Sequence, residues 1–113
     1  LAISVGNVHL KTEKTSGINF GALKAIEEVT TLPLVLHGGS GIPVNIRKRL
    51  ARESSVSKFN IGTELRMAFG NALRKSLTDN QDSFDRIRLL SPTIDAVKSV
   101  TIEVIRALNG KPE

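Results

Sequence analysis

The chain has no cysteine, no tryptophan and no tyrosine among its 113 residues. Without cysteine it can form neither disulfide bonds nor thiolate ligands for a metal, which fits a reducing compartment. Its four phenylalanines leave little stacking surface for the bases of single-stranded nucleic acid. No apolar run approaches the roughly 20 residues that span a bilayer, and no basic and then apolar leader is visible. We therefore expect a cytoplasmic protein with neither a nucleic-acid nor a membrane partner.

Two further absences bear on the class of the protein. The motif Gly-x-Ser-x-Gly does not occur in the chain, and this excludes an esterase of the α/β-hydrolase type. Residue 1 is a leucine, not a methionine, and it opens an apolar stretch over residues 1–5. A natural domain rarely begins inside a buried strand, so we expect residues 1–113 to be a single segment of a longer protein. Its composition, 40% hydrophobic and 24% charged, is typical of a globular fold.

Part of the net charge of +5 lies in one basic cluster. On a helix, Ile46 and Leu50 would face inward, so we expect the basic side chains of this segment on a solvated outer face. A nucleic-acid module built on this helix remains an alternative, and a steep loss of affinity with salt would support it. The cluster consists of Arg47, Lys48, Arg49 and Arg52.

Strand and helix signals alternate along the chain. Connections of about 20–25 residues, each holding a helix, are typical of parallel strands. Three parallel strands cannot close a barrel and need cover on both faces, so we expect further strands outside this chain. Asn19 is expected to cap the first helix, and Ser91 is expected to cap the last one, with Pro92 at its first position. The expected strands cover residues 1–5, 34–36 and 56–61, and the expected helices cover residues 20–29, 43–53, 64–77 and 92–109.

Apolar residues recur at helical spacing in the last two expected helices, and each set predicts the buried face of its helix. The two sets are Leu65, Phe69, Ala72, Leu73 and Leu77, and Ile94, Val97, Val104, Ile105 and Leu108.

Polar loops follow all three expected strands, where parallel α/β sheets place their sites. In the second loop, Gly38, Gly39 and Gly41 let backbone N–H groups approach an anion, and Ser40 adds a hydroxyl. In the third loop, Thr63 is expected to cap the next helix, whose N-terminus favours a phosphate. The alternative for the second loop is a tight turn between strand and helix with a surface histidine. The alternative for the third loop is that Thr63 is only a helix N-cap.

The only two histidines, His9 and His37, follow neighbouring expected strands. Their imidazoles could share one zinc ion, although each could instead bond a loop carbonyl. A catalytic zinc usually takes three protein ligands. For the third ligand, Glu13 and Glu64 are weak candidates.

Three segments together resemble one enzyme family. They are Val-Gly-Asn-Val-His at 5–9, His-Gly-Gly-Ser-Gly at 37–41 and Asn-Ile-Gly-Thr-Glu-Leu at 60–65. In order and spacing they resemble the class II, zinc-dependent ketose-bisphosphate aldolases, which include the fructose- and tagatose-bisphosphate aldolases. The resemblance implies an α/β fold that forms the C-terminal part of a (β/α)8 barrel, about strands six to eight with terminal helices. It also implies a glycolytic type of reaction, the cleavage of a ketose 1,6-bisphosphate to dihydroxyacetone phosphate and an aldehyde.

The resemblance also assigns roles to residues. It implies that His9 and His37 are two of three zinc ligands and that a monovalent cation binds nearby. The aspartate base and the remaining histidine would come from earlier strands, so we expect the isolated chain to be inactive. The full-length enzyme is expected to be a homo-oligomer. The residues implied in phosphate binding are Gly38, Gly39, Ser40, Asn60, Ile61, Gly62 and Thr63.

Two positions depart from the family pattern. Leu10 stands where the family usually has a glycine, and the segment 53–55 reads Glu-Ser-Ser where the family often has a glycine. At these positions the substrate pocket, the cation contact and a turn are expected to differ from those of the family.

The alternative function is a non-catalytic, truncated aldolase-like segment that acts through protein association at its exposed sheet edges.

Overall fold

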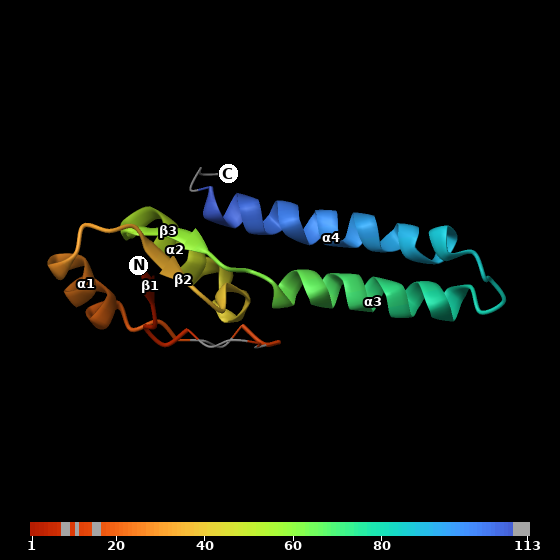
Figure 1. Ribbon diagram of the computed structural model, residues 1–113, viewed down its shortest axis with the longest axis horizontal. Helices are drawn as coiled ribbons and strands as arrows, with labels where there is room; N and C mark the ends of the chain where they lie inside the picture. Colours follow the sequence, from red (N-terminus) through yellow and green to blue (C-terminus); the bar gives the residue numbers. More distant parts are fainter. Residues whose placement is uncertain (8–9, 11, 15–16, 110–113) are drawn as a thin grey trace.

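The computed structural model describes residues 1–7, 10, 12–14 and 17–109. In these residues the fold is a three-stranded parallel sheet with four α-helices and one short 3-10 helix, Gly39–Gly41 (Figure 1). The strand order is β1 (Ala2–Ile3), β2 (Leu34–Leu36) and β3 (Val56–Phe59). Ala2 lies opposite Val35 in the first pair of strands. The predicted alternation of parallel strands and helices is confirmed.

Two strands are shorter than predicted because polar groups replace the ladder at their ends. After β1, the backbone N–H of Val5 donates to Asn7 Oδ1 at 2.8 Å instead of to a neighbouring strand. After β3, the carbonyl of Asn60 accepts from the N–H of Gly39 at 3.0 Å, and the chain turns. Both strands therefore end where the polar loops begin.

The core lies between the sheet and the first two helices. Helix α1 (Phe20–Val29) is capped by Asn19, whose Oδ1 accepts from the N–H of Ala22, as predicted, and it buries Leu23. Helix α2 (Val44–Glu53) begins after Pro43 and buries Leu50. Burial of such side chains removes about 25 cal/mol of unfavourable hydration per Å². The buried cluster consists of Ile3, Val5, Leu23, Leu34, Leu36, Ile42, Leu50 and Val56.

Helices α3 (Thr63–Asp79) and α4 (Arg86–Leu108) form an antiparallel hairpin that extends away from the sheet (Figure 1). The described chain is elongated, with extents of 59 × 28 × 21 Å. No helix in the described part of the chain combines the length and the apolarity that a membrane crossing requires.

The predicted start of the last helix at Pro92 is wrong, because Asp85 caps α4 two turns earlier. Its Oδ1 accepts from the N–H groups of Ile87 and Arg88 at 2.9 and 3.4 Å. Pro92 lies inside α4 on its exposed side. Proline removes one backbone hydrogen bond there, yet the hydroxyl of Ser91 donates to the carbonyl of Ile87 at 2.7 Å.

The predicted apolar faces of the hairpin are also partly wrong. Ile94 and Ile105 are 68% and 56% exposed, and Phe69 is 42% exposed. Small side chains are buried instead, among them Ser76 on α3 and Thr93 on α4. Small residues allow two helix backbones to approach closely, and this shifts the contact face away from the larger apolar residues.

Candidate functional site

The loops after β2 and β3 meet at the carboxyl edge of the sheet. The N–H of Asn60 donates to the carbonyl of Leu36 at 2.9 Å, and the N–H of Gly39 donates to the carbonyl of Asn60 at 3.0 Å. Beside this crossing lies a cavity of about 470 Å³, which His37 and Arg66 also line. Six of the seven residues predicted to bind phosphate line it: Gly38, Ser40, Asn60, Ile61, Gly62 and Thr63.

The seventh predicted residue, Gly39, packs underneath the cavity wall. A Cβ at this position would lie 3.0 Å from Ile61 Cγ1 and 3.2 Å from the carbonyl oxygen of Asn60. Gly38 adopts a left-handed conformation with φ 65°, which glycine favours. The glycines therefore bring the two loops into close contact.

The expected cradle of glycine N–H groups is only partly present. The N–H of Gly39 donates to Asn60, and that of Gly41 donates to the carbonyl of Gly38 at 3.1 Å. Because these donors are occupied, an anion in the cavity would depend on the Ser40 hydroxyl and on the first turn of α3.

Thr63 does not cap α3, contrary to the prediction. The helix begins at Thr63, with Gly62 at the cap position and no side-chain cap from it. The cap comes from the other loop, because Ser40 Oγ accepts from the backbone N–H of Glu64 at 3.2 Å. Ser40 therefore joins the glycine loop to the N-terminus of α3.

Arg66 is a candidate anion-binding residue that the sequence analysis missed. Its Nη2 donates to Thr63 Oγ1 at 3.2 Å, so the guanidinium lies over the first turn of α3. The available signal was spacing, since residues three apart on a helix share a face.

His37 lies at the mouth of the cavity and is held from two sides. Asn60 Nδ2 lies 3.1 Å from His37 Nδ1, a contact whose donor depends on the tautomer. Buried Asn7 donates from Nδ2 to the carbonyl of His37 at 2.9 Å. The sequence did not predict this role for Asn7. The available signal was a polar residue two positions before the candidate ligand His9.

The predicted metal centre lies partly outside the described residues. His9 is not among them, so its distance to His37 is not described. Within the described residues, no group of three or more His, Cys, Asp or Glu side chains could hold a metal ion. Glu64, a weak candidate for the third ligand, instead forms ion pairs with Arg47 and Lys14.

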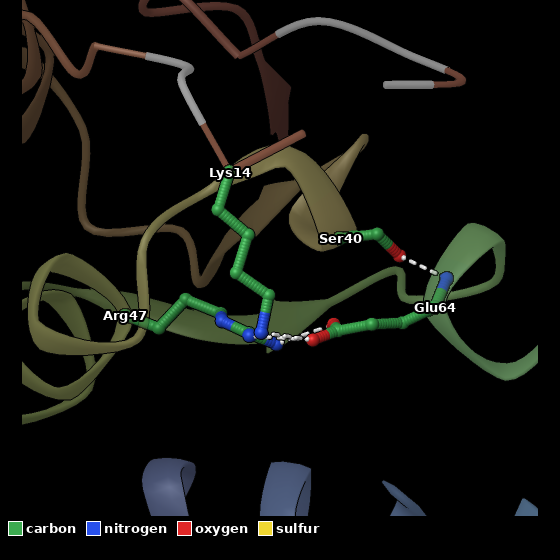
Figure 2. Close-up of polar contacts among 4 residues, drawn as sticks. All are labelled: Lys14, Ser40, Arg47 and Glu64. Carbon is green, nitrogen blue, oxygen red and sulfur yellow. Dashed lines mark hydrogen bonds and ion pairs between the residues drawn. The ribbon is translucent and has the colours of Figure 1, made fainter. Parts of the chain in front are cut away.

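Arg47 is buried, contrary to the expected outer face, with only 1% of its side chain exposed. Its Nη1 and Nη2 donate to Glu64 Oε2 and Oε1 at 2.9 and 3.0 Å, and Lys14 Nζ lies 2.6 Å from Oε1 (Figure 2). Arg49 lies over the ring of Phe20 at 4.1 Å and pairs with Glu53. These contacts remove two members from the basic cluster that a nucleic-acid module would need.

Glu64 remains charged because of these partners. Burial by itself would raise the pKa of its carboxyl group. The hydrogen bonds and positive charges of Arg47 and Lys14 outweigh burial and lower the pKa below its ordinary value.

Comparison with known proteins identifies the family. A family model described as fructose-bisphosphate aldolase class-II matches residues 1–112. The chain belongs to the class II fructose-bisphosphate aldolase family. The resemblance inferred from the three motifs is confirmed.

Relatives in this family are longer than the chain. A fructose-bisphosphate aldolase of Mycoplasma genitalium is 37% identical over 112 residues, which cover 93% of this chain and 38% of the relative. That of Geobacillus stearothermophilus is 35% identical over 106 residues, covering 94% of this chain and 37% of the relative. The chain therefore spans less than two fifths of the length of these aldolases.

A solved structure shows the same fold. The crystal structure of the YdjI aldolase from Escherichia coli K12 is 29% identical, with a TM-score of 0.71 over 96% of this chain and 38% of that chain. The α/β architecture with a parallel sheet is thus similar to that of an aldolase.

Proposed function

We propose that the complete protein catalyses the zinc-dependent, reversible cleavage of a ketose 1,6-bisphosphate to dihydroxyacetone phosphate and an aldehyde. In this proposal, β1 to β3 are about strands six to eight of a (β/α)8 barrel. The compartment is the cytoplasm and the enzyme is a homo-oligomer. The observation that carries the proposal is the cavity where His37, Ser40 and the N-terminus of α3 meet.

The cavity offers the chemistry that a phosphate group requires. Ser40 Oγ accepts from the N–H of Glu64, and its own proton is then available to a phosphate oxygen. The first turn of α3 adds backbone donors and a favourable dipole. Arg66 supplies a positive charge at the same turn. The proposed phosphate-binding residues are Gly38, Gly39, Ser40, Asn60, Ile61, Gly62 and Thr63.

His9 and His37 are the proposed zinc ligands of this chain, and a monovalent cation site is proposed in the loop that follows His9. The contact between Asn60 Nδ2 and His37 Nδ1 at 3.1 Å fixes the orientation of the imidazole ring at the edge of the cavity. His9 and His37 are two of the three protein ligands that a catalytic zinc usually takes, so in this proposal the third comes from another part of the complete protein. Zinc, when bound, is a Lewis acid for the ketone oxygen. Asn60 is proposed to bind substrate oxygens at the same edge.

The test uses the complete protein and measures zinc content together with aldol cleavage. We expect His37→Ala to lose both. We expect Ser40→Ala to raise KM about tenfold, because a hydrogen bond to a charged group contributes about 1.5 kcal/mol or more. Ser57→Ala, on the exposed side of β3, is the matched control.

Two results would contradict the proposal. Unchanged zinc content in His37→Ala would remove this histidine from the ligand set. Unchanged KM and kcat in Ser40→Ala would remove the serine from the phosphate site. Nothing in the described residues favours the alternative of a non-catalytic segment, and it is not proposed.

A further inference from the structure

We propose that the ion pair between Lys14 and Glu64 is a latch that holds the segment 12–14 against the wall of the phosphate cavity. Lys14 and Glu64 would then be positioning residues for the anion site. The consequence for phosphate affinity rests on the proposed function.

Glu64 joins four parts of the molecule through one residue. It belongs to the first turn of α3, and its backbone N–H donates to Ser40 of the glycine loop. Its carboxylate binds Arg47 of α2 and Lys14 of the segment 12–14 (Figure 2). A shift of any one of these parts must therefore be accommodated at Glu64.

The two cations have different roles at this carboxylate. Arg47 is buried and binds both oxygens in a bidentate pair, a geometry that fixes the orientation of the carboxylate. Arg47 alone balances the charge of Glu64. The side chain of Lys14 is 44% exposed, so it can leave the pair without burying an uncompensated charge. Arg47 thus fixes the position of Glu64, and the ion pair of Lys14 with Glu64 is the contact that can break.

The segment that carries Lys14 lies next to the wall of the phosphate cavity. Thr12, Lys14, Ser40 and Glu64 line a neighbouring hollow of about 290 Å³. Ser40 also lines the cavity that contains His37. Ser40 is therefore shared between the two spaces, with the latched segment on one side and the proposed phosphate position on the other.

The excess charge of the junction also favours an anion. One carboxylate and two cations leave a charge of +1 close to the first turn of α3, whose dipole has the same sign. Replacing Lys14 with a neutral residue would therefore have two effects. It would lower the positive potential at the first turn of α3, and it would release the segment 12–14 from Glu64.

The experiment compares Lys14→Met with Lys75→Met in the complete protein. Lys75 forms an exposed ion pair with Asp79 at 2.7 Å on the same helix, α3, so it controls for the loss of one lysine. Hydrogen exchange followed by mass spectrometry reports on the segment 12–14, and calorimetry measures the affinity for inorganic phosphate. Equal thermal melting of the two variants checks that both fold.

We expect Lys14→Met to speed exchange in the segment 12–14 and to weaken phosphate binding about fivefold, as loss of a partly exposed ion pair predicts. Lys14→Arg should restore both. Exchange or phosphate affinity that matches Lys75→Met would overturn the latch. A wild-type protein with neither phosphate binding nor aldol cleavage would contradict the proposed function instead, and the exchange comparison would still decide whether the latch exists.

Discussion

At the scale of the residue, Gly6 has a conformation that other residues cannot adopt without strain. Its φ is +99°, and a Cβ would collide with the carbonyl oxygen of Gly17. We expect Gly6→Ala to lower the free energy of unfolding by about 2 kcal/mol or more, measured by urea denaturation of the complete protein. Gly17→Ala is the control, because a Cβ there has no heavy atom within 4 Å. Equal losses in both variants would contradict the steric explanation.

Glu64 makes stability depend on pH in the acid range. Its pKa is lowered in the folded state, so its contribution is present above the unfolded pKa of about 4.3 and is lost as the pH falls through the folded value. We expect Glu64→Gln to destabilise the protein by about 3 kcal/mol at pH 7, since buried Arg47 loses its partner. Urea midpoints between pH 3 and 7 should fall less steeply toward acid in the variant. Parallel curves would show that another group causes the dependence.

Individual residues also show what sequence could not predict. The motifs at 37–41 and 60–65 contain seven of the ten residues that line the cavity, because these residues are concentrated in two short loops. The pairing of Arg47 with Glu64 spans 17 positions and two helices, and no local pattern reports it. The interpretation of a solvated basic face was wrong for Arg47 for the same reason, whereas Arg49 and Arg52 are exposed as predicted.

The backbone at Leu10 explains why a glycine is usual at this position of the family. Its φ is 58°, in the left-handed region, where a glycine has no steric penalty. The usual glycine of the family therefore suits the backbone that this chain adopts with a leucine. The sequence showed the departure but not the conformation.

At the scale of the element, the start of α4 depends on one carboxylate. Asp85 Oδ1 accepts from two N–H groups of the first turn. We expect Asp85→Ala to destabilise the hairpin by about 1 kcal/mol, measured as a lower urea midpoint. Asp82 is an exposed acidic residue in the same turn region. Asp82→Ala should change the free energy of unfolding by less than about 0.5 kcal/mol. A larger effect at position 82 would place the cap elsewhere.

The sequence predicted the start of α1 correctly and the start of α4 wrongly. Asn19 was correctly predicted to cap α1, because an isolated polar residue precedes a clear apolar period. The predicted start of α4 at Pro92 was wrong, because Asp85 caps the helix earlier in the chain. Pro92 can lie inside α4 because it is on the exposed side of the helix, while α4 also packs against α3.

At the scale of the whole molecule, the isolated chain exposes large apolar side chains on α4. Ile87, Ile94 and Ile105 are 71%, 68% and 56% exposed, and the sheet has only three strands in the described residues. We expect the isolated 113-residue chain to self-associate at micromolar concentration, measured by sedimentation velocity. The double variant Ile94→Lys and Ile105→Lys should sediment more slowly. A chain that stays monomeric at all concentrations would contradict this expectation.

Helix α3 connects the cavity lined by Ser40 and His37, the proposed phosphate site, to the far turn of the hairpin. Its 17 residues give a length of about 25 Å. A tilt of about 5° around its distal end would move its first turn by about 2 Å, which exceeds the tolerance of a hydrogen bond. Mechanically the helix is a lever, and the Ser40 contact lies at its moving end. How firmly the turn between α3 and α4 is held in place therefore determines how precisely Ser40 and the first turn of α3 are aligned at the proposed anion site.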